Sequence, residues 1–195
     1  ACRRAVELEP GNPRFHHNLG RVYQLRRSFD AALAAYERAL ELDPELTDAH
    51  RRRGGILAQD RARLTAAEAA LRTAAQLDST SGDVWAELAG VLEAQDRLPE
   101  AAKALERAVA LVPDRSQFYL ALGRLYHRLG RSPASEKALA RHAELEAGGG
   151  DALKAARLAV QRAPGEARNH RALSLALAEQ GDMEGAARQL QVARA

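Results

Sequence analysis

Apolar residues recur at helical spacing along most of the chain, and short polar turns separate one stretch from the next. Residues 16–44 show the pattern in full, with apolar positions three and four residues apart in two successive stretches. The first stretch carries Leu19, Gly20 and Tyr23, and the second carries Ala32, Tyr36 and Ala39 before Pro44. The pattern therefore predicts pairs of amphipathic helices rather than a sheet.

The helix pairs repeat with a period of 34 or 35 residues. Pro10, Pro44, Ser79 and Pro113 mark successive unit ends. Each first helix is predicted to carry a small residue, and so is each second helix, which lets the two helices approach closely while large residues fill the space between turns. These small residues are Gly20, Gly54, Ala89 and Gly123 in the first helices and Ala32, Ala67 and Ala101 in the second. A single pair cannot bury its apolar face, so we expect the pairs to stack.

These residues resemble the tetratricopeptide repeat, whose pattern is Trp-x2-Leu-Gly-x2-Tyr, then Ala-x3-Phe, then Pro. The resemblance covers nearly the whole chain and implies an all-α fold, a right-handed α-solenoid of stacked antiparallel helix pairs. We divide the chain into residues 1–10 (second helix of a truncated repeat), 11–44, 45–79 (a repeat with a one-residue insertion), 80–113, 114–147, 148–164 (a Gly-rich break and a half-repeat helix) and 165–195 (the terminal repeat).

The second repeat departs from the pattern. Its extra residue fits best in the turn at residues 60–63, and Arg53 replaces an expected Leu. Gly55 follows Gly54, although a glycine within a helix costs about 1 kcal/mol relative to Ala. We therefore expect a weak or rotated first helix here, with Arg53 reaching solvent.

A larger departure follows the fourth repeat. Pro164 lies one and a half periods after Pro113, and Gly148–Gly150 lie between them. Residues 151–164 have the pattern of a second helix without a first helix before it. Two explanations stay open: a segment holding that first helix is absent from this sequence, or the glycines form a hinge before a genuine half-repeat.

Composition argues against several classes of protein. No apolar run approaches the roughly 20 residues that span a bilayer, and Cys2 has no second cysteine to pair with. We expect a soluble protein, with the cytoplasm favoured. The formal net charge is +3, and 26 of the 29 basic residues are Arg. This weak net charge, with only 4% aromatic residues, disfavours nucleic-acid binding.

Candidate chemistry is sparse. Of the six histidines, His16, His50 and His170 occupy the large-residue position that Trp85 and Tyr119 fill elsewhere, which indicates a packing role. Gly148–Gly150 lack the Lys-Ser/Thr pair of a phosphate-binding loop. We therefore expect a protein that is not an enzyme, with no metal site and no cofactor.

The resemblance implies instead that the first helices line a concave groove for a peptide or a partner protein. The third repeat would contribute the acidic Asp83, Glu87 and Glu93, between basic neighbours, so we expect a partner with an acidic or mixed-charge segment. We predict Arg21, Arg51 and Arg52 as anchors. The full predicted set is Arg14, His17, Asn18, Arg21, Arg51, Arg52, Arg124, His127 and Arg128.

Two alternatives stay open. The solenoid ends could stack on another copy or another subunit, which would make the chain a structural assembly part. The arginines could also bind nucleic acid, which the acidic third repeat disfavours.

Overall fold

Helices make up the regular structure. The computed structural model describes residues 2–194, and the side chains of residues 2–147 and 153–194. Within that range the elements are α-helices and one 3-10 turn. The first helices are α2 (Pro13–Leu25), α4 (Thr47–Leu57), α6 (Gly82–Ala94), α8 (Ser116–Arg128) and α10 (Ala167–Glu179). The second helices are α1 (Cys2–Leu8), α3 (Phe29–Leu42), α5 (Leu64–Leu77), α7 (Leu98–Leu111), α9 (Ser132–Arg162) and α11 (Met183–Val192).

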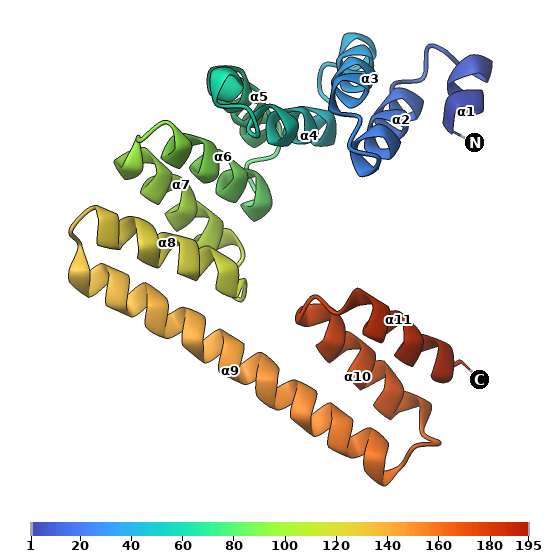
Figure 1. Cartoon of the computed structure of the whole chain (residues 1–195), viewed down its shortest axis with the longest axis vertical. Helices are drawn as coiled ribbons and strands as arrows, with labels where there is room; N and C mark the ends of the chain where they lie inside the picture. Colours follow the sequence, from blue (N-terminus) through green and yellow to red (C-terminus); the bar gives the residue numbers. More distant parts are fainter. Residues whose placement is uncertain (1, 195) are drawn as a thin grey trace.

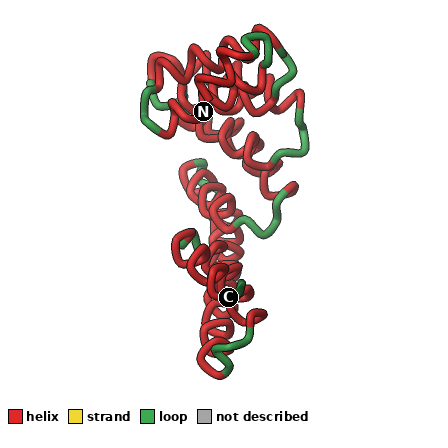
Figure 2. Tube along the Cα trace, turned by 90° about the vertical axis from the view of Figure 1, so that its right-hand side faces the viewer, coloured by secondary structure: helices red, strands yellow, loops and turns green. Residues whose placement is uncertain are grey.

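The helices form antiparallel pairs that stack in chain order. The pairs α2–α3, α4–α5, α6–α7 and α8–α9 follow one another around a curved array, and α1 precedes them (Figure 1). Short loops connect the helices, as Figure 2 shows. The last pair, α10–α11, packs through α10 on the C-terminal half of α9. The predicted fold class, an all-α solenoid of helix pairs, is confirmed.

Small residues on first helices face large residues on second helices. A Cβ atom added to Gly20 would lie 2.6 Å from the Tyr36 ring, and one added to Gly54 would lie 2.7 Å from Leu71. Tyr36 and Leu71 are both fully buried. The spacing of small and large residues in the sequence therefore sets how closely each pair of helices packs.

Ring N–H groups tie four first helices to the loops that precede them. The residue concerned is a His or a Trp, and its partner is the backbone carbonyl six residues earlier. Because a carbonyl only accepts hydrogen bonds, each of these histidines carries a proton on Nε2. The pairs are His16 with Pro10 (2.8 Å), His50 with Pro44 (2.9 Å), Trp85 with Ser79 (3.1 Å) and His170 with Pro164 (2.7 Å).

The second repeat has the shortest first helix of the described pairs, α4, with 11 residues where α2, α6, α8 and α10 have 13. A 3-10 turn, Arg61–Arg63, follows in the segment where the sequence placed the extra residue. The Arg53 side chain is half-buried, at 31% exposed, and its Nε lies 3.5 Å from Glu37 Oε1 on the preceding second helix.

α9 is a single helix of 31 residues. The sequence left two explanations open for the Gly-rich break at Gly148–Gly150, a missing segment or a hinge, and the backbone is helical through these residues. With no first helix in between, the second helix of the fourth repeat runs directly into the half-repeat. Helical continuation keeps the backbone hydrogen bonds that a turn would lose, which offsets the low helix propensity of glycine. The other predicted repeat boundaries stay predictions.

Among the described side chains, this arrangement buries three clusters of apolar residues, one of them a small cluster of Ala74, Ala75 and Val84 between α5 and α6. The largest one runs from α3 to α8 and includes Tyr36, Leu71 and Leu105. A smaller one joins the C-terminal half of α9 to α10 and α11 through Leu153, Leu173 and Ala186, among others. The last helix pair is therefore displaced along α9 instead of stacking on the pair before it (Figure 1).

Candidate partner-binding groove

Neighbouring first helices are joined by charged side chains. Asp48 of α4 is the centre of the first cluster, because His17 Nε2 of α2 lies 3.0 Å from its Oδ2. Within α4, Arg51 Nη2 donates to Asp48 Oδ1 at 2.7 Å and Arg52 Nε donates to Oδ2 at 2.9 Å. His17, Arg51 and Arg52 together hold the pKa of the Asp48 carboxyl well below its ordinary value.

Arg51 extends this cluster to α6. Its Nη1 donates to Glu87 Oε1 at 2.7 Å, while the rest of the guanidinium stays on Asp48. The Arg51 side chain is 26% exposed and that of Glu87 is 35% exposed. Burial raises the pKa of Glu87 and Arg51 opposes the rise, so desolvation of the carboxylate outweighs the attraction between the two charges.

Acidic side chains of the third repeat form ion pairs with arginines of the fourth repeat. Arg128 of α8 donates to Glu93 Oε1 at 2.6 Å and to Asp96 Oδ1 at 3.2 Å. Arg115, just before α8, donates to Asp83 Oδ1 at 3.2 Å. The charges that alternate along the first helices therefore neutralise one another between neighbouring repeats.

Other members of the predicted set are exposed and unpaired. Arg14, Asn18 and Arg21 lie on the surface of α2, and Arg124 and His127 lie on the surface of α8. Among the residues that the structure describes, no carboxylate lies within 4.0 Å of the Arg14, Arg21 or Arg124 guanidinium. The structure thus separates the predicted residues into four that are paired, namely His17, Arg51, Arg52 and Arg128, and five that are unpaired.

Sequence reasoning named Asp83, Glu87 and Glu93 as groove residues and did not pair them. Arg51 and Glu87 are 36 residues apart, close to one period, and this register was the available signal. Across the described side chains, no group of three or more His, Cys, Asp or Glu is arranged to hold a metal ion. Nor does any described helix have the length and apolar character needed to cross a membrane. The site is a surface of helices with charged side chains.

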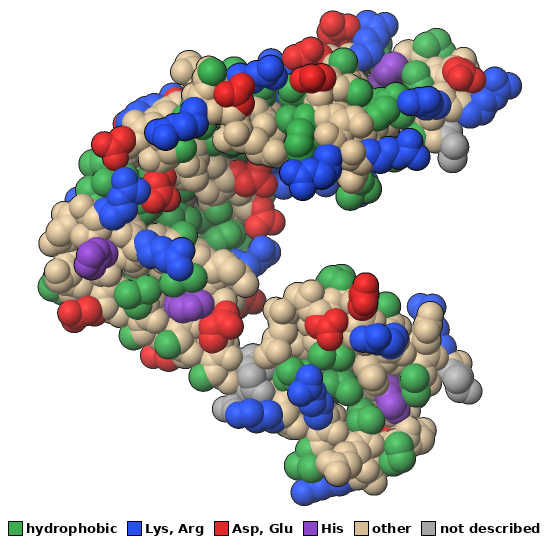
Figure 3. Space-filling model, in the orientation of Figure 1, with side chains coloured by type: hydrophobic (Ala, Val, Ile, Leu, Met, Phe, Trp, Pro, Cys, Tyr) green, Lys and Arg blue, Asp and Glu red, His purple; other side chains and the backbone are tan. Residues whose placement is uncertain are grey.

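The array curves around an open hollow, seen as the gap between the N-terminal repeats and the last helix pair in Figure 3. Acidic and basic side chains alternate over the visible face of the N-terminal repeats.

Comparisons with known proteins agree with this architecture. Models of the Tetratricopeptide repeat family match residues 13–46 and 57–118. Human Tetratricopeptide repeat protein 7B is 38% identical over 96 residues, which is 49% of this chain and only 11% of that protein. A solved structure of MamA is 22% identical with a TM-score of 0.64, covering 93% of this chain and 89% of MamA.

A second solved structure, YrrB, is described as a TPR protein with an unusual peptide-binding site. It is 20% identical with a TM-score of 0.67 and covers 99% of this chain and 90% of its own. A structure of pilF from Pseudomonas aeruginosa is 20% identical with a TM-score of 0.61, covering 93% of this chain and 75% of its own. These three structures share the fold. With the period, the paired helices and the family matches, the chain belongs to the tetratricopeptide repeat family.

Proposed function

We propose that this chain is a non-enzymatic interaction module whose first helices bind an extended segment of a partner protein. The segment runs across α2, α4, α6 and α8 and carries an acidic residue near each end. Arg21 and Arg124 are its anchors. The family supports binding of a protein or peptide partner, and YrrB is a TPR protein with a peptide-binding site.

The proposal rests on one position that is equivalent in the four first helices. The position after the small residue of each first helix is occupied in turn by Arg21, Gly55, Gly90 and Arg124. Packing requires neither glycine, since a Cβ atom on Gly55 would only reach ordinary contact with Glu87 at 3.6 Å, and one on Gly90 would meet nothing within 4 Å. Each glycine nevertheless costs its helix about 1 kcal/mol relative to Ala. We infer that the two glycines leave helix backbone uncovered so that a ligand can approach closely.

The register also sets the length of the ligand. Neighbouring packed helices are about 10 Å apart, so the three steps from α2 to α8 span roughly 30 Å. An extended chain covers about 3.3 Å per residue, so about nine residues bridge Arg21 and Arg124. Both guanidiniums are free to form bidentate hydrogen bonds with carboxylates. Small residues fit the middle of the ligand, above the glycines.

Arg51 and Arg52 take a supporting role in this proposal. Both were predicted as anchors, but Asp48 and Glu87 already hold their guanidiniums. A ligand carboxylate would have to displace a fixed partner and leave a partly buried charge unpaired. With His17, these arginines keep α2, α4 and α6 in register. Arg14, Asn18, His127 and Arg128 flank the two anchors.

Selection from a random nonapeptide library tests the proposal. The intact chain is compared with Arg21→Glu/Arg124→Glu and with a control, Arg171→Glu/Arg188→Glu, which reverses two exposed arginines of α10 and α11. The wild type and the control should enrich the same peptides, with Asp or Glu near both ends, and the anchor variant should lose them. Enrichment without an acidic bias, or the same peptides on the anchor variant, would contradict the groove assignment.

A second function, assembly through the solenoid ends, is favoured by a separate observation. The terminal helices expose apolar side chains: Leu8 of α1 is 68% exposed, and Leu190 and Val192 of α11 are 43% and 51% exposed. Sedimentation velocity over a hundredfold range of protein concentration tests it. A sedimentation coefficient that rises with concentration, and that Leu190→Gln/Val192→Gln holds constant, would support stacking of copies. A constant coefficient for the wild type would exclude it.

A further inference from the structure

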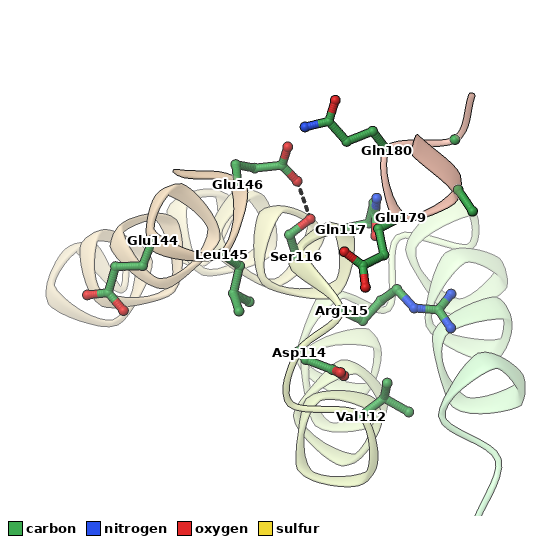
Figure 4. Close-up of a pocket in the computed structure, with 12 residues that line it drawn as sticks. Val112, Asp114, Arg115, Ser116, Gln117, Glu144, Leu145, Glu146, Glu179 and Gln180 are labelled. Carbon is green, nitrogen blue, oxygen red and sulfur yellow. Dashed lines mark hydrogen bonds between the residues drawn. The ribbon is translucent and has the colours of Figure 1, made fainter. Parts of the chain in front are cut away.

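A second concave site borders the groove at the start of α8, near the middle of α9. It is a cleft of about 1080 Å³ between the start of α8, the middle of α9 and the end of α10. Three separate parts of the chain line it: residues 112 and 114–117 before and within α8, residues 144–146 of α9, and residues 178–181 at the turn between α10 and α11. Figure 4 shows these side chains around the opening, with Glu146 and Ser116 joined by a hydrogen bond.

The cleft follows from the one-and-a-half-period spacing. On α9, Glu146 is the last described residue bonded to α8, through Ser116, and Leu153 packs in the core shared with α10. These two residues are separated by about 10 Å of helix rise. Because α10 begins a new pair beyond that interval, α8 and α10 do not close against each other. The same displacement that produces the long helix therefore opens the cleft.

Negative charge dominates the lining. Asp114, Glu144, Glu146 and Glu179 contribute carboxylates from all three parts of the chain, and Arg115 contributes the one cationic side chain among the lining residues described. Arg115 is already engaged, since it pairs with Asp83 and stacks at 5.3 Å on the Phe118 ring.

The carboxylates are freer than the arginine. Glu144 pairs with Arg141, and Glu146 accepts from Ser116. In the described part of the chain, no basic side chain lies within 4.0 Å of Asp114, Glu146 or Glu179. A concave surface lined by one sign of charge concentrates its field in the opening, which attracts ligands of the opposite sign.

We propose that this cleft binds a basic segment of a partner protein. Lys or Arg side chains of the segment pair with Asp114, Glu146 and Glu179, and their aliphatic stems lie against Val112, Leu145 and Ala178. The ligand is thus opposite in charge to the one proposed for the groove. The chain would hold an acidic segment on its first helices and a basic segment at the bend of the array, and neither site depends on the other.

Fluorescence anisotropy tests the cleft with two labelled, end-blocked octapeptides in 150 mM salt. One alternates Arg with Ala, and the other alternates Glu with Ala. The intact chain should bind the Arg peptide, and Glu146→Gln/Glu179→Gln should weaken that binding about tenfold. The control variant, Glu45→Gln/Glu136→Gln, removes two exposed carboxylates outside the cleft and should stay within twofold of wild type.

A further variant guards against a structural artefact. Glu146 bonds to Ser116, so Asp114→Asn/Glu179→Gln removes two cleft charges while keeping that bond, and it should also weaken binding about tenfold. Circular dichroism confirms that each variant folds. No binding of the Arg peptide up to 1 mM, a loss of Glu-peptide binding in the cleft variants equal to the loss of Arg-peptide binding, or equal loss in the control variant would overturn the proposal.

Discussion

Arg51 Nη1 of α4 lies 2.7 Å from Glu87 Oε1 of α6, and the same guanidinium donates to Asp48. One arginine therefore joins two repeats and both of the carboxylates that face it. Its charge stabilises the contact between repeats, whereas the exposed Arg21 and Arg124 have no such partner among the described residues and are available to bind a ligand. The stability of the groove and its recognition of a ligand thus rest on different arginines.

Removing Arg51 should cost more than removing the charge of Glu87. We expect Arg51→Ala to lower the free energy of unfolding by about 2 kcal/mol, because it leaves the partly buried Glu87 carboxylate without its donor and removes one of the three partners of Asp48. Glu87→Gln keeps an acceptor and relieves desolvation, so its effect should stay below about 0.5 kcal/mol. Urea unfolding at pH 7 measures both, with the exposed Arg21→Ala as control. Equal losses from both substitutions would contradict this account.

The Asp48 cluster should make stability fall in acid. The folded-state pKa of Asp48 lies below its ordinary value of 3.8, so the stabilisation is complete above that value and is lost as the pH falls through the folded-state pKa. We expect the unfolding free energy of the wild type to drop more steeply than that of Asp48→Asn between about pH 5 and pH 2. Urea titrations at four pH values give the two slopes. Parallel curves would show that the cluster does not contribute to the pH dependence of stability.

Gly90 should oppose stability and support binding. A Cβ atom added to Gly90 would meet nothing within 4 Å, so Gly90→Ala should raise the unfolding free energy by about 0.5–1 kcal/mol. Gly20→Ala is the matched contrast and should destabilise the chain, because its Cβ would lie 2.6 Å from Tyr36. Gly90→Leu should keep the fold and weaken the acid-ended nonapeptides about tenfold. Unchanged binding by Gly90→Leu would mean that the ligand does not cross α6 at this point.

The turns inside the repeats depend on left-handed backbone. Gly130 has φ = 70°, and Arg27, Asp96 and Gly181 take similar angles at the matching turns. Gly130→Ala should lower the unfolding free energy by about 1 kcal/mol through backbone strain. Gly165→Ala is the control, since that glycine is exposed, has open space and lies outside the left-handed region. Thermal melts of the two variants compare the positions directly, and similar shifts would argue against strain at Gly130.

Much of the fold was predictable from residue spacing alone. The pair Gly20 and Tyr36 is followed one period later by the pair Gly54 and Leu71. Such pairs identify which helices must be in contact. A 3-10 turn, Arg61–Arg63, lies in the segment where the spacing places the extra residue of the second repeat. The pairing of Arg51 with Glu87 was not predicted, because charge in a sequence does not reveal which side chains meet across neighbouring helices. For the same reason, the sequence indicated Arg51 only as a ligand contact and did not show that it joins neighbouring repeats.

The sequence by itself determined the helix pairs, their period and their stacking, because these depend on local propensity and on apolar positions that repeat within one unit. Only the tertiary structure decided the path through Gly148–Gly150, where a helix and a hinge have similar local cost and long-range packing on α8 and α10 selects between them. The cleft beside Glu146 depends on that selection. Its lining residues come from segments up to 69 positions apart, and only the bend of the array brings them together.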